Sequence, residues 1–237
     1  MSKPRILVAD IETAPGEAYI WNMGEQRIAL SMLKTSPRML CYAAKYVGEK
    51  EVYFRSEWEY GGRLRMLNGL WELIANADAT LTYNGDRFDL PKILGEFVLA
   101  KLPPPPPVAS IDLLKTVKKL GLICNKLAFV SPLLGHGNKI ETDFSLWTDV
   151  MAGKADAWAK MKRYNIQDVK LLEKDYKTLR PYMTNHPYLH SKAGCCPNCG
   201  SNKTQARGQR RTRSFWIDRI HCQACGAWSQ GTRRKVG

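Results

Sequence analysis

The sequence predicts an α/β protein, with a body built on a mixed sheet flanked by helices and a small cysteine-rich tail. Segments of strand-like composition come first, and helical and strand-like segments then alternate, an order typical of a mixed sheet. Two Cys-x-x-Cys pairs near the C-terminus predict the tail. The chain has 237 residues, 44% of them hydrophobic, which suits one sizeable core with an appendage and excludes a disordered protein.

The first half of the body starts with the apolar run 6–9, which has the composition of a buried strand. In residues 14–36 the hydrophobic residues show no clear periodicity. Period-2 and period-3.6 patterns then predict a hairpin over 39–47 and 51–54, a helix over 63–75, a strand over 79–83 and a helix over 90–100. Pro91 is tolerated in the first turn of the last of these helices.

The second half begins with the five-proline spacer 103–107, which is expected to cross the surface and return the chain to the sheet. Residues 108–114 lead into a basic helix that ends near Gly121. Further helices are predicted over 127–134 and over 155–179, where Pro181 ends the second. We expect an α/β domain over 1–182, a linker over 183–194 and a tail domain over 195–237.

Two carboxylates directly follow the first strand, at Asp10 and Glu12. Residues i and i+2 of a strand point to the same face, so these side chains are predicted to project side by side. Burying two unpaired carboxylates costs several kcal/mol or forces protonation. A divalent cation between them removes this cost, and hard oxygen ligands suit Mg²⁺ or Mn²⁺.

Two further stretches of the sequence contain acidic residues that could join Asp10 and Glu12 in one site. Asp86 and Asp89 lie where the strand over 79–83 runs into a helix, and either could be a helix cap. Tyr164 and Asp168 are four apart in the long helix and therefore share one of its faces, as an ordinary surface pair also would.

Taken together, these stretches resemble a DEDD-type 3′→5′ exonuclease of the ribonuclease-H-like superfamily, in its tyrosine-bearing subclass. The first motif is matched by Asp10-Ile-Glu12-Thr13, the second by Asn84 with Phe88-Asp89, and the third by Tyr164-x-x-x-Asp168. The resemblance covers residues 4–180 and extends to stand-alone exonucleases of bacteriophage genomes that resemble the proofreading domain of family-B DNA polymerases. It implies a ribonuclease-H-like mixed sheet and a role in DNA replication or turnover.

The resemblance also implies roles for the residues. Asp10 bridges two Mg²⁺ or Mn²⁺ ions, Glu12 and Asp168 complete the site of the ion that binds the attacking water, and Asp89 serves the other. The Tyr164 hydroxyl orients that water, because a phenol with a pKa near 10 is a poor base at neutral pH. Asp86 lies off the motif position and is not expected in the site.

The sequence specifies the residues that contact substrate less sharply than the residues that bind metal. Thr13 closes the first motif, Asn84 could bond the terminal nucleotide or only shape the turn, and Phe88 could stack on a base or pack in the core. Lys139 belongs to a set of lysines that could line a phosphate track or only form solvated helix faces: Lys115, Lys118, Lys119, Lys126 and Lys139. His136 could touch substrate or lie on the surface.

The tail contains Cys196-x-x-Cys199 and Cys222-x-x-Cys225, and it resembles a zinc ribbon with one structural Zn²⁺. Neither Cys195 nor His221 is expected on the metal. From residue 192 to the end the tail carries ten Lys or Arg against one acid, so +9 of the total charge of +14 lies here. This charge predicts a polyanionic partner, with nucleic-acid contacts at Arg210, Arg211, Arg213 and Trp216.

The leading functional hypothesis is a two-metal exonuclease that releases 5′-mononucleotides from single-stranded or frayed 3′ ends of DNA. The alternatives are an RNA-directed or structure-specific nuclease of the same fold, or an inactive zinc-ribbon protein that binds nucleic acid. A replication or recombination protein is a further possible partner of the tail. Seven cysteines favour a reducing cytoplasm, that of the host if the gene is a phage gene, and neither a signal peptide nor a membrane segment is expected.

Overall fold

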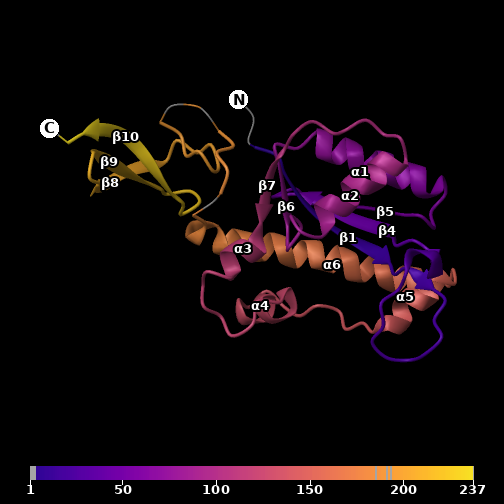
Figure 1. Ribbon diagram of the computed structural model, residues 1–237. Coiled ribbons are helices and arrows are strands. Elements are labelled where there is room, and N and C mark those ends of the chain that lie inside the picture. Colours follow the sequence, from indigo (N-terminus) through magenta and orange to yellow (C-terminus); the bar gives the residue numbers. More distant parts are fainter. Residues whose placement is uncertain (1–3, 185, 191, 193, 237) are drawn as a thin grey trace.

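The computed structural model describes residues 4–184, 186–190, 192 and 194–236. Its body has three layers, a five-stranded sheet with helices on both faces (Figure 1). The strand order is β5-β4-β1-β6-β7, with antiparallel pairing of β1 with β4 and of β4 with β5, and parallel pairing of β1 with β6 and of β6 with β7. The predicted mixed sheet is therefore confirmed. The strand bounds are β1 Ile6–Ala14, β4 Arg38–Tyr46, β5 Tyr53–Ser56, β6 Ala79–Thr82 and β7 Ala109–Asp112.

The central strand β1 buries both of its faces, which explains its continuous apolar run. Leu7 and Ala9 pack toward α1 and α2, whereas Ile6 and Val8 pack into the core on the α6 side. The helix bounds are α1 Gly62–Ala75, α2 Asp89–Leu99, α3 Leu113–Val117, α4 Leu127–Leu133, α5 Phe144–Met151 and α6 Ala155–Leu179. Figure 1 shows α1 and α2 on one side of the sheet and α6 on the other.

The long helix α6 crosses the sheet beside β1 and β4. Val169 and Leu172 belong to its buried stripe. Glu173 fixes the helix to the sheet, because its carboxylate pairs with the buried Lys45 ammonium and accepts a 2.8 Å hydrogen bond from the Gly48 amide. The helix ends at Leu179, because Pro181 cannot continue it, and a short 3₁₀ turn, Arg180–Tyr182, follows.

Four short segments of the body, three of them within residues 14–36, were not predicted. Residues 14–36 contain β2 Glu17–Ala18, the 3₁₀ turn Leu30–Met32 and β3 Leu33–Thr35, with β2 and β3 paired as a two-stranded ribbon. Strands of two and three residues are too short to show a period, and their pairing is set by contacts distant in sequence. The eight-residue helix α5 is the fourth unpredicted segment.

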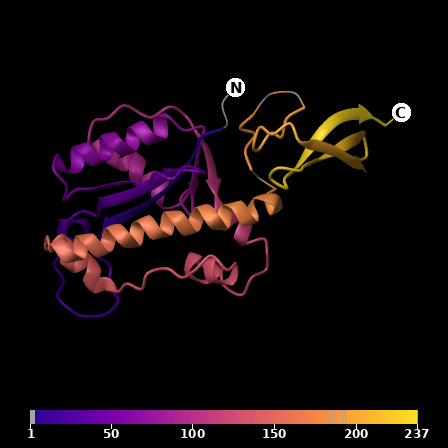
Figure 2. The ribbon, with the colours of Figure 1, turned by 180° about the vertical axis from the view of Figure 1, so that it is seen from behind.

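The tail forms an antiparallel sheet of β8 Thr204–Arg211, β9 Phe215–Cys222 and β10 Trp228–Lys235. Both ribbon views place it beyond the C-terminal end of α6 (Figure 2). There the Arg180 guanidinium donates to the Asn198 carbonyl, and the Tyr176 hydroxyl lies 2.7 Å from Nε2 of His186. In the described chain, no helix combines the length and the hydropathy needed to cross a membrane.

Candidate active site

The acidic cluster lies where β1 and α6 run side by side. Asp10, Glu12 and Asp168 each offer a carboxylate oxygen, and these atoms all lie within 4.8 Å of one another. Asp10 and Glu12 come from the same face of β1, as their spacing predicts, and Asp168 comes from the middle of α6. Asp168 is 3% exposed, so the cluster is closed on its α6 side.

The cluster concentrates negative charge in a buried place. Burial, followed by repulsion from Glu12, raises the pKa of Asp10 well above its ordinary value. Burial and the Asp168 carboxylate raise the pKa of Glu12 to about 8, and burial raises the pKa of Asp168. These directions mean that the carboxylates lack enough compensating positive charge from the protein alone.

Asp89 approaches the same cluster from the other side of β1. It is the first residue of α2, and its Oδ1 accepts a 3.3 Å hydrogen bond from the Ile11 amide, between the two acids of β1. Its oxygens lie outside the 4.8 Å group, yet its charge raises the pKa of both Asp10 and Glu12. Burial raises the pKa of Asp89 itself to about 6.

The turn before α2 sets the position of Asp89. Asn84 has a φ of 67°, and its backbone N–H donates a 2.8 Å hydrogen bond to Oδ1 of Asp112. At Gly85 a Cβ atom would lie 2.2 to 2.7 Å from the Thr82 side chain, so only glycine fits. Asp86 points elsewhere, because its carboxylate bonds to the Lys115 ammonium and the Ser110 hydroxyl.

Tyr164 and Lys139 stand beside the carboxylates. The Lys139 Nζ lies 2.6 Å from Oδ2 of Asp168 and 5.0 Å from the centre of the Tyr164 ring. Trp147 of α5 contacts the Tyr164 ring edge to face, with ring centres 6.2 Å apart. Burial raises the pKa of Tyr164 to about 12, so its hydroxyl stays protonated at neutral pH.

Asn165 is a site residue that the sequence reasoning missed. Its buried Nδ2 donates a 2.6 Å hydrogen bond to Oδ2 of Asp10 and a 3.3 Å one to the Asp10 carbonyl. It therefore fixes the carboxylate that the motif places at the centre of the cluster. The available signal was a polar residue on the apolar stripe of α6, since Met161 and Val169, four residues away on either side, are both apolar.

The loop that carries Lys139 is tied to α6 at two points. His136 Nδ1 lies 2.6 Å from Oδ1 of the fully buried Asp175, and its Nε2 lies 3.1 Å from the Thr178 hydroxyl. Gln167 donates to the Asn138 carbonyl. His136 is thus an anchor of the loop rather than a surface side chain.

The other predicted contact residues fall into two places. Thr13 lines a hollow of about 440 Å³ with Phe144 and Trp147, next to the cluster. Phe88 is 41% exposed with the Lys92 ammonium 4.7 Å from its ring centre, which removes the core-packing alternative. The other four lie in the tail instead, beyond the end of α6: Arg210 and Arg211 on β8, Trp216 on β9, and Arg213 in the turn between these strands.

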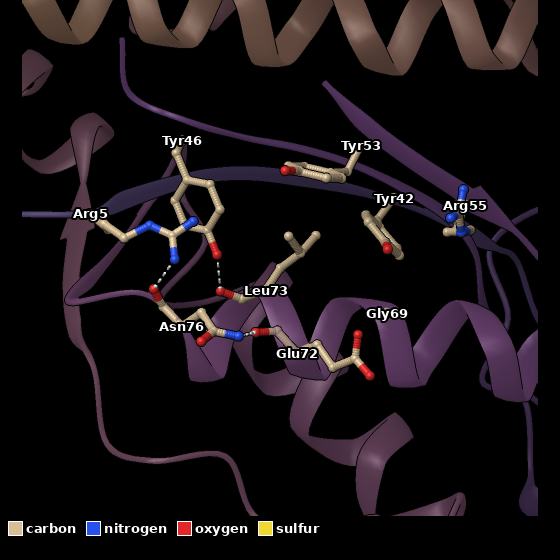
Figure 3. Close-up of a pocket in the computed structure, with 9 residues that line it drawn as sticks. All are labelled: Arg5, Tyr42, Tyr46, Tyr53, Arg55, Gly69, Glu72, Leu73 and Asn76. Atoms are coloured by element: carbon tan, nitrogen blue, oxygen red, sulfur yellow. Dashed lines mark hydrogen bonds between the residues drawn. The ribbon is translucent and has the colours of Figure 1, made fainter. Parts of the chain in front are cut away.

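A separate cavity of about 330 Å³ lies on the opposite face of the sheet, against α1 (Figure 3). The Arg5 guanidinium lies 3.8 Å from the Tyr46 ring centre and donates a 3.2 Å hydrogen bond to the Asn76 carbonyl. The Tyr46 hydroxyl donates to the Leu73 carbonyl at 2.8 Å. These contacts join the sheet to α1, and the acidic cluster faces away from this cavity.

Four thiols of the tail form a second cluster, made of Cys196, Cys199, Cys222 and Cys225, with sulfur atoms within 4.8 Å of one another. The Sγ atoms of Cys196 and Cys225, and those of Cys199 and Cys222, lie 3.7 Å apart. A tetrahedral Zn²⁺ with bonds of about 2.3 Å needs sulfur atoms about 3.8 Å apart, so the group fits zinc. As expected, Cys195 lies outside this group, and His221 instead packs on Trp228, with ring centres 4.7 Å apart.

The acidic cluster likewise fits divalent cations. Its donors are hard carboxylate oxygens, and Oδ1 of Asp168 is buried without a hydrogen-bond partner in the described part of the chain. An oxygen in this state costs free energy unless it binds a cation. Asp10, Glu12 and Asp168 would hold one ion, and Asp89 with Asp10 would hold another.

The raised pKa of Glu12 gives a pH prediction for the metal-free protein. Folding moves this pKa from 4.5 up to about 8, so the folded state binds the proton more tightly. The free energy of unfolding should therefore fall as pH rises through this window, by a few kcal/mol at most. Denaturant unfolding of wild type and Glu12→Gln at several pH values measures the effect. In Glu12→Gln, the free energy of unfolding should not show this fall with pH. In wild type, added Mn²⁺ should suppress the fall. Identical dependence of the unfolding free energy on pH in the two proteins would contradict the prediction.

Comparison with known proteins agrees with this architecture. A family model described as RNase_H superfamily matches residues 48–180. A solved structure of the family B DNA polymerase from the archaeon Pyrobaculum calidifontis is similar in fold, with a TM-score of 0.56 and 15% sequence identity over 75% of this chain. The match spans only 25% of that polymerase chain. No curated protein sequence matches this one. The chain belongs to the RNase_H superfamily.

Proposed function

We propose that the protein is a metal-dependent 3′→5′ exonuclease that hydrolyses phosphodiester bonds at DNA 3′ ends and releases 5′-mononucleotides. The observation that supports this most strongly is the meeting of Asp10, Glu12 and Asp168 within 4.8 Å, with Asp89 beside them. Two divalent cations held there would supply an activated water and neutralise charge on the leaving oxygen. The fold resemblance to a family B DNA polymerase is consistent with DNA as the substrate.

The side chains around the cluster have complementary tasks. Asn165 holds the Asp10 carboxylate in one orientation through its 2.6 Å hydrogen bond. Lys139 places an ammonium beside Asp168, where it can also contact a phosphate oxygen of the substrate. Thr13, Asn84 and Phe88 are proposed contacts of the terminal nucleotides, with the exposed Phe88 ring available for base stacking.

Tyr164 orients the attacking water and does not remove its proton, since its pKa is raised to about 12. Tyr164→Phe should lower kcat by about 10- to 100-fold, because the water loses its hydrogen-bond acceptor and its alignment. The affinity for Mn²⁺ should stay unchanged, since the clustered carboxylates are untouched and a protonated phenol is a poor ligand for this ion. Single-turnover cleavage together with Mn²⁺ titration separates the two effects, and wild-type cleavage rates in the variant would remove this role.

The direct test of the proposed function is digestion of a 5′-labelled oligonucleotide with Mg²⁺ or Mn²⁺. Matched single-stranded DNA, duplex DNA and RNA should be compared. We expect a ladder of 3′-shortened DNA products, formed most rapidly from the single strand. Internal cuts or a preference for RNA would indicate another nuclease of the same fold, and binding without cleavage would indicate an inactive binding protein.

We further propose that the zinc-bound tail over 195–237 is a nucleic-acid-binding domain, linked through 183–194 to the nuclease domain over 1–182. The Arg211 guanidinium lies 5.5 Å from the Trp216 ring centre, a pairing of charge and aromatic surface that suits a nucleic-acid strand. Arg210 and Arg213 are exposed on the same ribbon of β8 and β9. A replication or recombination protein remains the alternative occupant of this surface.

A further inference from the structure

A groove of about 460 Å³ runs along one flank of α6. One wall is the helix itself, through Arg163, Gln167, Lys170 and Lys174. These positions are spaced by four, three and four residues and therefore form one stripe of the helix. The stripe spans 11 residues, or about 16 Å at a rise of about 1.5 Å per residue. The other wall is the loop that His136 anchors.

The groove is positively charged and its cations are free to bind a ligand. Arg163, Lys170 and Lys174 are all exposed, and none of them pairs with a carboxylate in the described ranges of the chain. Lys174 reaches only the His136 carbonyl, at 3.4 Å. Among the residues that the structure describes, no acidic side chain lines the groove, whereas Glu72 lines the cavity of Figure 3. Clustered, unpaired cations of this kind suit a polyanion.

The groove continues into the candidate active site. Asn138 and Ile140 line both this groove and an adjoining hollow of about 390 Å³. Lys139, Tyr164 and one acidic residue, Glu141, line that hollow, and Lys139 pairs with the neighbouring Asp168. Since the loop is held by His136 and Gln167, both hollows are formed before any ligand binds.

We propose that this groove binds the phosphate backbone of a single DNA strand whose 3′ end lies at the acidic cluster. The proposal rests on the proposed exonuclease function for its polarity. Lys170 and Lys174 lie between Asp168 and the C-terminal end of α6, and the basic tail lies beyond that end (Figure 2). The strand therefore runs from the carboxylates along α6 toward the tail. We infer an unpaired strand because the buried Asp168 closes the cluster on its α6 side, which leaves less room for a duplex.

The test removes the three cations together, in the full chain, as Arg163→Gln, Lys170→Gln and Lys174→Gln. The matched control removes three exposed cations from other surfaces, as Lys50→Gln, Arg65→Gln and Lys101→Gln. Fluorescence anisotropy with a 5′-labelled dT trinucleotide and a dT 15-mer, without added Mg²⁺ or Mn²⁺, gives affinity over a series of KCl concentrations. Thermal unfolding verifies that each variant is folded.

For the 15-mer, the groove variant should bind at least about tenfold more weakly at low salt than the control variant. Its slope of log affinity against log salt should be less negative by about 2, since three phosphate contacts at about 0.7 each are lost. The gain in affinity from trinucleotide to 15-mer should shrink in parallel. Equal losses of affinity in the groove variant and the control variant would overturn the proposal, as would an unchanged salt slope in the groove variant. An equal loss of affinity for a 15-base-pair duplex would also overturn it.

Cleavage by wild type with Mn²⁺ forms a separate arm of the experiment. If wild type binds the 15-mer through the groove but cuts nothing, the exonuclease function fails and the groove stands. If wild type shortens the 15-mer and the groove variant binds it as tightly as wild type does, the groove fails and the function stands.

Discussion

Replacement of Asp10 by Asn is expected to lower exonuclease activity by at least about 1,000-fold, the largest effect of any single substitution in the body. The negative charges of Glu12, Asp89 and Asp168 all raise the pKa of Asp10, which places Asp10 at the electrostatic centre of the cluster. Asn keeps the size of the side chain and can still accept the hydrogen bond from Asn165, but it removes the charge that holds the cations. Initial rates on a 5′-labelled single strand with Mn²⁺ measure the loss.

The fold should survive this change. Because the pKa of Asp10 is raised, its charged form destabilises the metal-free protein, so a neutral side chain should not lower the free energy of unfolding. Asp86→Asn is the matched control, since Asp86 pairs with Lys115 and Ser110 outside the cluster. Equal activity of the Asp10 variant and this control would show that catalysis does not depend on the cluster.

Replacement of Cys222 by Ser is expected to have the largest effect on the tail. Cys222 is buried, and its sulfur lies 3.7 Å from that of Cys199 within the four-thiol group. The tail is short and its strands β8 and β10 are mostly exposed, so it has little core of its own. Structural zinc supplies about 10–16 kcal/mol of folding free energy in small domains, and losing one thiolate should forfeit most of it.

The measurements are the zinc content of the purified protein and limited proteolysis of the tail. Cys222→Ser should contain little zinc and lose residues beyond the end of α6, whereas the body should stay resistant. Cys195→Ser is the control, because Cys195 lies next to the group but outside it. A Cys222 variant that retains one zinc and an intact tail would refute the metal site.

Local rules in the sequence were sufficient for much of this fold. The apolar run before Asp10 fixed a central strand, and the alternation of its faces placed Asp10 and Glu12 together. The spacing of Tyr164 and Asp168 placed both side chains at one point of α6. The helix α5 could also have been found, since Asp143 caps it by accepting a 2.9 Å hydrogen bond from the Ser145 amide and Leu146 and Val150 form its buried stripe.

The remainder depends on contacts between distant segments. Lys139 was one lysine among several in the sequence, and only the anchored loop brings it to Asp168. Lys115 pairs with Asp86 and Lys119 donates to the Thr184 hydroxyl, so these two lysines are already engaged. The basic groove also has two walls that come from separate segments, and neither wall has a sequence signature of its own.

The most direct test of the central claim is to count the Mn²⁺ ions bound by the acidic cluster, by calorimetry on protein whose tail zinc is already in place. Wild type should bind two Mn²⁺ ions, and Asp10→Asn should lose this binding because the shared carboxylate is gone. Wild type that binds no Mn²⁺, or that binds it as Asp10→Asn does, would contradict the claim that Asp10, Glu12, Asp89 and Asp168 form a metal-dependent nuclease site.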